Sequence, residues 1–332
     1  MLSPDALQDF RRRYVAAWRS LRDTGPANFS SVLRELLHPT VAWHGPQPLN
    51  HLNGVDAFIG SFWTPFTRAF RDVERRDDIV LAGEFKAGSW LASTGHYVAT
   101  FSEAWLGIAP THEAVTLRYG EFCRVEADKI VEVYVIIDLL DLMRQAGCWP
   151  RILPPPLGSP DRIPGPVSAD GVILAPQSAD AGLRSLKLVE AMIAGLMEYD
   201  QRSLDSMRME RFWDVNSMMW YGPAGIGTAR GLSGFQRCHQ APFLKAFPDR
   251  VGGNHKARLG EGNYVASTGW PSMRATHSGD GWLGRPATNK PITQRIMDFW
   301  RRENDLLLEN WVFIDTVDLL MQMGVNVLPA AH

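Results

Sequence analysis

Two aspartates close a pair of similar segments, and the surroundings of each decide which chemistry its carboxylate can perform. Asp138 ends residues 132–138, Asp315 ends residues 309–315, and a helical pattern follows both. In an apolar pocket a carboxylate has a raised pKa and can accept a proton from a carbon next to a carbonyl group. Directly before a helix it can instead cap the first backbone N–H groups. The residues themselves leave both roles open.

Both segments alternate as β-strands do, so each has two distinct faces. The face that ends in the aspartate carries Glu132, Tyr134, Ile136 and Asp138 in one segment and Glu309, Trp311, Phe313 and Asp315 in the other. The second face of residues 131–137 is wholly aliphatic. We expect the acidic and aromatic face to look into a ligand pocket. The aliphatic face is expected to be covered by the other half of the chain, which predicts an intrachain pseudo-dimer of two sheets.

The similarity of these segments extends over most of the chain, which is an internal repeat. At an offset of 177 residues the matched segments are 43–46 with 220–223, 65–72 with 242–249, 105–107 with 282–284 and 132–138 with 309–315. Residues 92–95 match 266–269 at an offset of 174, a shift that is compensated before residue 105. So many matches in the same order predict two tandem domains with the same fold.

A proline-rich stretch separates the two copies. Residues 149–180 contain eight prolines, which fix φ and cannot donate to a strand ladder. We interpret this stretch as a stiff, extended linker. The predicted domains are therefore residues 1–148, the first copy, and residues 181–332, the second copy.

Each copy begins with helices and ends with strands. Residues 4–21 carry apolar side chains at spacings of three and four, after Ser3 as an N-cap, and residues 183–197 repeat this pattern. Residues 90–100, 115–125 and 130–137 are rich in β-branched and aromatic residues, as strands are. Helices followed by strands indicate an α+β class with an antiparallel sheet. The predicted architecture is two tandem cone-shaped α+β barrels, each with helices packed on a curved sheet around an apolar interior.

Composition and charge exclude several kinds of partner. The net charge of −2 and the scattered arginines argue against nucleic acid, and no apolar run is long enough to cross a membrane. The three cysteines are far apart, and the histidines lack the spacing of metal ligands, so neither disulfides nor a metal site is expected. We expect a cytoplasmic protein whose partner is a small hydrophobic ligand; a homo-oligomer is left open.

The repeated motifs resemble those of the SnoaL-like polyketide cyclases and ester cyclases, within the nuclear-transport-factor-two-like superfamily. The motifs that carry the resemblance are Trp-x-Gly-Pro, Pro-Phe-x-x-Ala-Phe-x-Asp, Leu-Gly, and Glu-x-aromatic-x-x-x-Asp followed by Leu-Leu and Gly. The resemblance covers both copies. It implies the nuclear-transport-factor-two-like fold, and it specifies that fold better than it specifies a reaction.

The resemblance also implies a mechanism and candidate residues. In the characterised cyclases a carboxylate at the end of the last strand acts as general acid and base in an intramolecular aldol ring closure, without a metal or organic cofactor. By motif match, Asp138 and Asp315 would take this role. Candidates for binding the substrate are His44, Tyr221, His96, Trp270, Glu121, Asp298, Tyr134 and Trp311. Because His44 matches Tyr221 and His96 matches Trp270, the polar helpers differ between the copies, and one copy alone could keep an active pocket.

Two functions from different classes remain. One is cofactor-independent acid/base chemistry, an intramolecular aldol cyclisation or an isomerisation, on a small hydrophobic carbonyl compound. The other is a non-catalytic module of the same fold that binds a small molecule or another protein. A third possibility, epoxide hydrolysis on the same fold, would need an Asp-Arg-Asp cluster that activates water, and one sequence is not enough to assemble such a cluster. An aspartate with a raised pKa in a closed cavity would favour catalysis, whereas a filled core would favour the second function.

Overall fold

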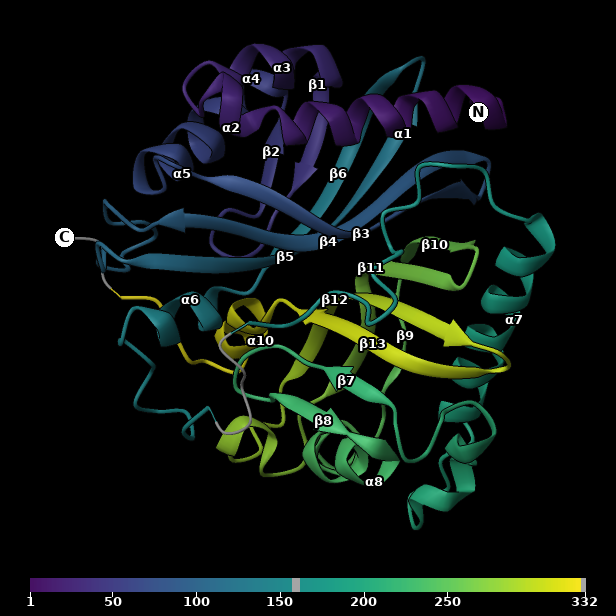
Figure 1. Cartoon of the computed structure of the whole chain (residues 1–332). Helices are drawn as coiled ribbons and strands as arrows, with labels where there is room; N and C mark the ends of the chain where they lie inside the picture. Colours follow the sequence, from purple (N-terminus) through teal and green to yellow (C-terminus); the bar gives the residue numbers. More distant parts are fainter. Residues whose placement is uncertain (157–161, 330–332) are drawn as a thin grey trace. The chain divides into compact units, whose positions relative to one another are not determined.

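The computed structural model describes residues 1–156 and 162–329. The fold is α+β and contains two sheets, one in each of two compact units (Figure 1). The first unit comprises Met1–Cys148, Pro164–Pro176 and Asn326–His332, and the second comprises Trp149–Ile163 and Gln177–Val325. In the described residues no helix combines the length and apolar character that a membrane crossing requires.

The helices of the first unit come mostly before its long strands. They are α1 (Pro4–Arg19), α2 (Leu21–Thr24), α3 (Phe29–Leu36), α4 (Val55–Phe58), the π-helix η1 (Ile59–Trp63), α5 (Thr64–Ala69) and, after the last strand, α6 (Leu139–Gln145). The side chain of Ser3 accepts a hydrogen bond from the backbone of Ala6, which confirms the predicted N-cap of α1. In Figure 1, α1 to α5 lie on one face of the sheet.

The sheet of the first unit has six strands in the order β2-β1-β6-β5-β4-β3. Their bounds are β1 Leu37–His44, β2 His51–Asn53, β3 Glu74–Phe85, β4 Gly88–Thr100, β5 Ala114–Glu126 and β6 Lys129–Ile137. The three predicted strands agree with β4, β5 and β6 to within two residues. The sheet is antiparallel, as expected, except where β1 lies parallel to β6.

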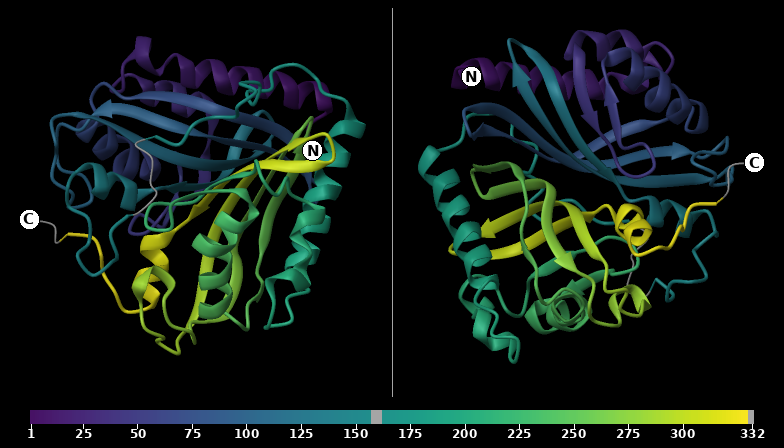
Figure 2. Two further views of the ribbon diagram at one scale, coloured as in Figure 1. Left: turned by 60° about the horizontal axis from the view of Figure 1, so that its bottom comes forward. Right: turned by 180° about the vertical axis from the view of Figure 1, so that it is seen from behind.

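The second unit repeats this plan around a curved sheet (Figure 2). Its helices are α7 (Ala179–Leu196), η2 (Leu204–Met207), η3 (Met209–Arg211), α8 (Gly231–Phe235), η4 (Gln236–Gln240), α9 (Ala241–Ala246), η5 (Trp282–Gly284) and α10 (Thr316–Gln322). Its strands are β7 (Met219–Tyr221), β8 (Thr228–Arg230), β9 (Val251–Gly252), β10 (His255–Glu261), β11 (Tyr264–Thr276), β12 (Pro291–Glu303) and β13 (Leu306–Ile314). The strands of this seven-stranded sheet follow the order β10-β11-β12-β13-β7-β8, and β9 pairs with β11 beside this path.

The proline-rich stretch does not stay outside the two units. Residues 164–176 belong to the first unit, where Val172 forms a bridge with Val80 at the outer edge of β3. The backbone N–H of Val80 donates to the carbonyl oxygen of Gly171 over 2.9 Å, and Ile173 donates to the carbonyl of Val80 over 3.3 Å. Part of the predicted linker therefore completes the edge of a sheet.

The two faces of the last strand are the reverse of the prediction. Val133 of β6 points toward the helices, into the apolar interior with Trp18 and Trp43, whereas Tyr134 stacks on His44 on the opposite face. In the second unit Val312 and Ile314 of β13 face the interior in the same way. The aliphatic face is therefore the one that the helices cover. The pseudo-dimer was predicted on the assumption that this aliphatic face is the outer surface of the sheet. That assumption does not hold, and the pseudo-dimer stays a prediction.

Candidate functional site in the second copy

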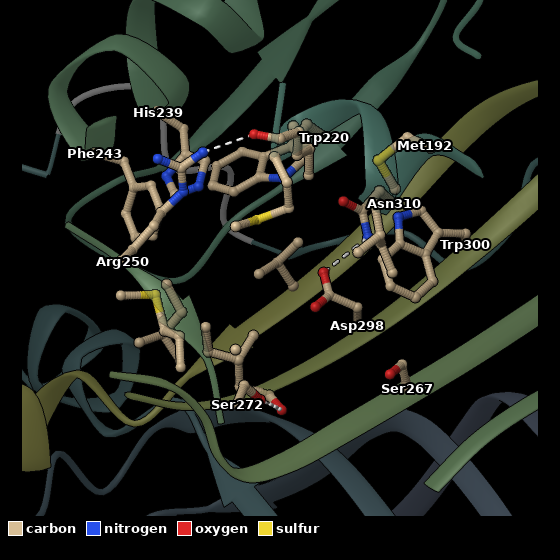
Figure 3. Close-up of a pocket in the computed structure, with 18 of the residues that line it drawn as sticks. Met192, Trp220, His239, Phe243, Arg250, Ser267, Ser272, Asp298, Trp300 and Asn310 are labelled. Carbon is tan, nitrogen blue, oxygen red and sulfur yellow. Dashed lines mark hydrogen bonds between the residues drawn. The ribbon is translucent and has the colours of Figure 1, made fainter. Parts of the chain in front are cut away.

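The interior of the second copy contains a cavity of about 260 Å³. Helix α7 closes one side of it, η4 and α9 another, and strands β11, β12 and β13 form its floor. Most of the lining is apolar or aromatic, including Trp220, Phe243 and Trp300, which Figure 3 shows around the hollow. A concave, mostly apolar space of this size with a few polar groups suits a small ligand.

Asp298 of β12 supplies a carboxyl group to the wall of this cavity. Its Oδ1 accepts a long hydrogen bond of 3.4 Å from the side-chain amide of Asn310 on the neighbouring strand β13 (Figure 3). Its other oxygen, Oδ2, has no hydrogen-bond partner among the described residues. Desolvation by burial raises the pKa of Asp298 to about 7. Near neutral pH this carboxyl group can therefore both accept and donate a proton.

His239 contributes a second titratable side chain to the same cavity. Its ring is held by stacking on Trp220, at 4.5 Å between centroids, and lies 5.1 Å from the ring of Phe243. Burial lowers the pKa of His239 to about 3, so the imidazole is neutral at pH 7. Its Nδ1 is buried and has no hydrogen-bond partner within residues 1–156 and 162–329.

Two exposed apolar side chains lie at the mouth of the cavity. Met197, at the end of α7, and Val251, at the start of β9, both line the cavity and are 59% and 56% exposed. Large exposed apolar side chains at an opening are unusual unless a ligand or partner contacts them. Exposed apolar side chains therefore border the opening, next to the charged Arg250.

The corresponding interior of the first copy is filled. The space that remains there is about 20 Å³, room for no more than a water molecule. Arg75 of β3 lies in this interior beside Trp18, and its side chain is fully buried. The guanidinium carbon lies 4.3 Å from the ring centroids of both Trp18 and Tyr119, as in cation–π contacts.

A hydrogen-bonded network satisfies this buried arginine. Arg75 donates to Glu121 over 3.1 Å, to Asp77 over 2.9 Å and to the hydroxyl of Ser93 over 2.8 Å. Tyr14 of α1 donates to Glu121 as well. Glu121 is thus engaged by its neighbours rather than presented to a ligand. This predicted binding residue belongs to a packed core, which is a structural role.

The two copies differ most at the positions that surround the cavity. At the 177-residue offset, Arg75 corresponds to Gly252 and Glu121 to Asp298. Gly252 lines the cavity, and nothing lies within 4 Å of the place where its Cβ would be. Three apolar residues of the first copy, Phe62, Val73 and Val133, correspond to His239, Arg250 and Asn310 in the second. Removal of one large side chain and gain of three polar ones distinguish the open interior from the filled one.

Asp315 does not line the cavity of the second copy, and Asp138 does not line the small space in the first. Asp315 caps α10 by accepting from the backbone N–H of Asp318 over 3.2 Å, and it pairs with Arg295 at 3.0 Å. Asp138 caps α6 in the same way, from the backbone N–H of Asp141. The prediction that these carboxylates look inward is wrong, because the faces of the strand are reversed. The capping role that the sequence also allowed is confirmed in both copies.

The stability of the fold should depend on this cap. Replacing Asp315 by Ala removes the capping acceptor and the partner of Arg295, so the free energy of unfolding should fall by about 1–2 kcal/mol. Asn is also a good N-cap residue, so Asp315→Asn should lose less. Urea denaturation of the full chain followed by tryptophan fluorescence measures both variants. Equal losses for Ala and Asn would contradict the capping role.

Six other predicted binding residues also lie on outer faces. His44 stacks on Tyr134 at 4.4 Å, and Tyr221 stacks on Trp311 at 5.4 Å. The remaining two are His96, whose Nδ1 lies 3.1 Å from a carboxylate oxygen of Asp78, and Trp270, whose ring contacts the guanidinium of Arg295. The structure does not bring these six together with the cavity. Of the ten predicted residues, Asp298 alone lines it.

The sequence interpretation missed the other polar residues of the cavity, among them His239, Arg250 and Asn310. A signal was present for these three, because each is a polar residue at a repeat position where the other copy has an apolar one. Polar residues are rarely placed in an apolar interior without a purpose, since their burial costs free energy. No group of three or more His, Cys, Asp or Glu side chains suited to a metal ion occurs in the described parts of the chain.

Comparison with solved structures found similar proteins that match part of this chain. A protein assigned to the SnoaL-like polyketide cyclases from Jannaschia sp. CCS1 is 18% identical, with 47% of this chain and 99% of that protein covered and a TM-score of 0.34. TsrD from Streptomyces laurentii is 17% identical, with 45% and 99% covered and a TM-score of 0.35. IdmH from Streptomyces antibioticus is 21% identical, with 40% and 97% covered and a TM-score of 0.31.

Among curated proteins the search found no match. The model of the SnoaL-like polyketide cyclase family, in contrast, matches the sequence twice, over residues 8–146 and 199–323. These two segments fall on the two repeats, and the second includes the strands of the open cavity but not α7. The chain is therefore a tandem member of the SnoaL-like polyketide cyclase family.

Proposed function

We propose that the second copy performs acid/base chemistry on a small hydrophobic carbonyl compound, without a cofactor, as an intramolecular aldol cyclisation or an isomerisation. The observation that carries this proposal is the carboxyl group of Asp298. It lies on the wall of an apolar cavity, and its pKa is raised to about 7. A base whose pKa is close to the working pH combines a useful ionised fraction with a strong tendency to take up a proton.

The proposed step is a proton transfer between the ligand and Asp298. The ionised carboxylate takes a proton from the carbon next to the ligand's carbonyl group; the C–H bond breaks, an O–H bond forms, and the electron pair moves to the carbonyl oxygen. The resulting enolate attacks a second carbonyl group of the same molecule or is protonated at another carbon. Asp298 returns its proton to the new alkoxide or to that carbon, so no external reagent is consumed.

Two neighbouring polar residues support this chemistry. Asn310 holds Oδ1 of Asp298 and so directs Oδ2 to the ligand. His239 is a neutral imidazole on the cavity wall, and a neutral N–H can stabilise an enolate oxygen without first losing a proton to Asp298. The surrounding tryptophans keep water away from the reactive enolate.

A proton-exchange experiment tests this function without the natural substrate. The probe is 2-tetralone, a small apolar ketone, in D2O, and ¹H NMR follows the replacement of its α-protons by deuterium. Because the ionised form of Asp298 is the base, the protein-dependent rate should be low at pH 5, rise to half its maximum near pH 7 and level off above it. The rate of hydroxide-catalysed exchange without protein is subtracted at each pH.

The outcome separates the two function classes. Protein-dependent exchange with this pH profile supports the catalytic function. Binding of 2-tetralone, seen as quenching of tryptophan fluorescence, without any protein-dependent exchange would contradict it and favour a non-catalytic binding module of the same fold.

A further inference from the structure

Arg250 is a charged residue on the wall of the cavity that the proposed proton transfer does not use. It directly precedes β9, lines the cavity and is partly buried. One of its terminal nitrogens, Nη2, donates to the carbonyl oxygen of Leu196, the last residue of α7, over 2.8 Å. No ion pair joins its guanidinium to a carboxylate in residues 1–156 and 162–329.

A partly buried guanidinium without an acidic partner is costly. Moving a charge away from water is unfavourable unless an opposite charge or hydrogen bonds compensate for the loss. Burial lowers the pKa of Arg250, which reflects this cost, although the side chain stays charged. In the first copy, by contrast, the buried Arg75 contacts both Glu121 and Asp77. The positive charge of Arg250 is therefore not compensated by a carboxylate of the described residues, and a bound anion would compensate it.

The contact with Leu196 does not account for the arginine. A guanidinium has five N–H donors, and this contact uses one. A lysine or a neutral amide could also donate to the last carbonyl of a helix. At the matching position the first copy has Val73, which is buried and does without any polar group. The charge is thus a feature of the copy with the open cavity.

The position of Arg250 gives the cavity two chemically different ends. Figure 3 shows Arg250 near His239 and Phe243, well separated from Asp298 and Asn310. An anion bound at Arg250 would therefore not be pressed against the carboxylate of Asp298. Most of the remaining lining is apolar, and the other polar residues in it, His255, Ser267 and Ser272, carry no formal negative charge.

We infer that the ligand of the second copy is an apolar compound that carries a carboxylate, bound by Arg250, in addition to the carbonyl group that faces Asp298. The planar fork of a guanidinium matches the two oxygens of a carboxylate, which a point charge such as lysine cannot do. Because this inference rests on the proposed function, it narrows the substrate class to hydrophobic oxo acids.

A pair of isosteric probes tests the inference on the full-length protein. Isothermal titration calorimetry compares 2-naphthoate, which carries a carboxylate, with 2-naphthamide, which is neutral. A charge-assisted contact should make 2-naphthoate bind about 10- to 100-fold more tightly. Arg250→Gln, which keeps a donor for Leu196, should abolish this preference, and Arg250→Lys should restore part of it. Arg237→Gln removes the same charge from an exposed position of η4 and should leave the preference intact.

Each result bears on a different claim. Equal affinity of the wild type for both probes would overturn the carboxylate inference and leave the cavity and its proton transfer unaffected. A preference that survives Arg250→Gln would also overturn it, since the anion would then bind elsewhere. If neither probe binds, the carboxylate inference fails; exchange of the 2-tetralone protons then decides separately whether the cavity is a reaction site.

Discussion

Replacing Asp298 by Asn is expected to lower the protein-dependent α-proton exchange of 2-tetralone by about 10²- to 10⁴-fold, the usual worth of a positioned general base. The amide has nearly the same shape as the carboxyl group and can still bond to Asn310, but it cannot accept a proton from carbon. The cavity should keep its volume, so the affinity for 2-naphthamide should change little. NMR exchange rates at pH 8, where wild-type Asp298 is ionised, give the largest contrast.

The matched control is Asp315→Asn, because the repeated motif gave Asp315 the catalytic role whereas the cavity contains Asp298. Asp315→Asn should retain the exchange activity, with at most a small loss of stability. If Asp315→Asn abolishes exchange and Asp298→Asn does not, Asp298 is not the base and Asp315, the residue that the motif indicates, is. Circular dichroism of both variants shows whether a loss of activity is a loss of folding.

Replacing Arg75 by Met is expected to lower the free energy of unfolding of the first copy by about 3–5 kcal/mol, because it leaves a buried carboxylate without its partner. Methionine keeps much of the volume of arginine, so a cavity contributes little to the loss. Glu121 and Asp77 would each lose their ion pair, and the aromatic rings around the guanidinium would lose a cation–π contact. Chemical denaturation followed by circular dichroism measures the change.

Arg22→Met is the control for this experiment. Arg22 pairs with Asp23 at the surface, where both side chains are about 70% exposed, and exposed pairs contribute little to stability. A loss of similar size in the two variants would contradict the central role given to Arg75. The double variant Arg75→Met with Glu121→Gln should recover part of the stability, since it removes the uncompensated charge as well.

The sequence was sufficient to predict the architecture because architecture depends on patterns that both copies share. The strands β4, β5 and β6 follow from runs of β-branched and aromatic residues, and the N-cap of α1 follows from Ser3 and Pro4. The edge strand β3 was not predicted: residues 74–85 begin with five charged residues, which is not a strand pattern, and pairing with β4 overrides that local signal.

The orientation of the last strand could not be predicted from alternation alone. A period of two separates the residues into two faces but does not say which face the helices cover. The acidic and aromatic face of β6 looked suited to a pocket, yet its Glu132 and Tyr134 bond to each other and to neighbours on the outer face. The aliphatic face packs against the helices, and its apolar character was the better indication of which side of the strand faces the interior.

The residues that the repeat shares and the residues that form the site are different sets. Shared polar residues maintain the backbone: Asp72 and Asp249 bind the backbone N–H groups of Thr100 and Thr276, and Gln145 bridges backbone groups of Thr116. The cavity is built where the copies diverge. The motif that recurs in both halves therefore identified residues that cap helices and bind backbone groups. The candidate reactive group, Asp298, lies outside that motif.

The chain's path limits how the protein can be divided. Residues 164–176 belong to the first unit, although residues 149–163 before them belong to the second. A fragment cut at residue 148 would lack the hydrogen bonds that Gly171 and Ile173 form with Val80, leaving the edge of β3 bare. Bare strand edges recruit other chains and promote aggregation. Cleavage of the chain between its repeats should thus yield a first-copy fragment that aggregates instead of an independently stable domain.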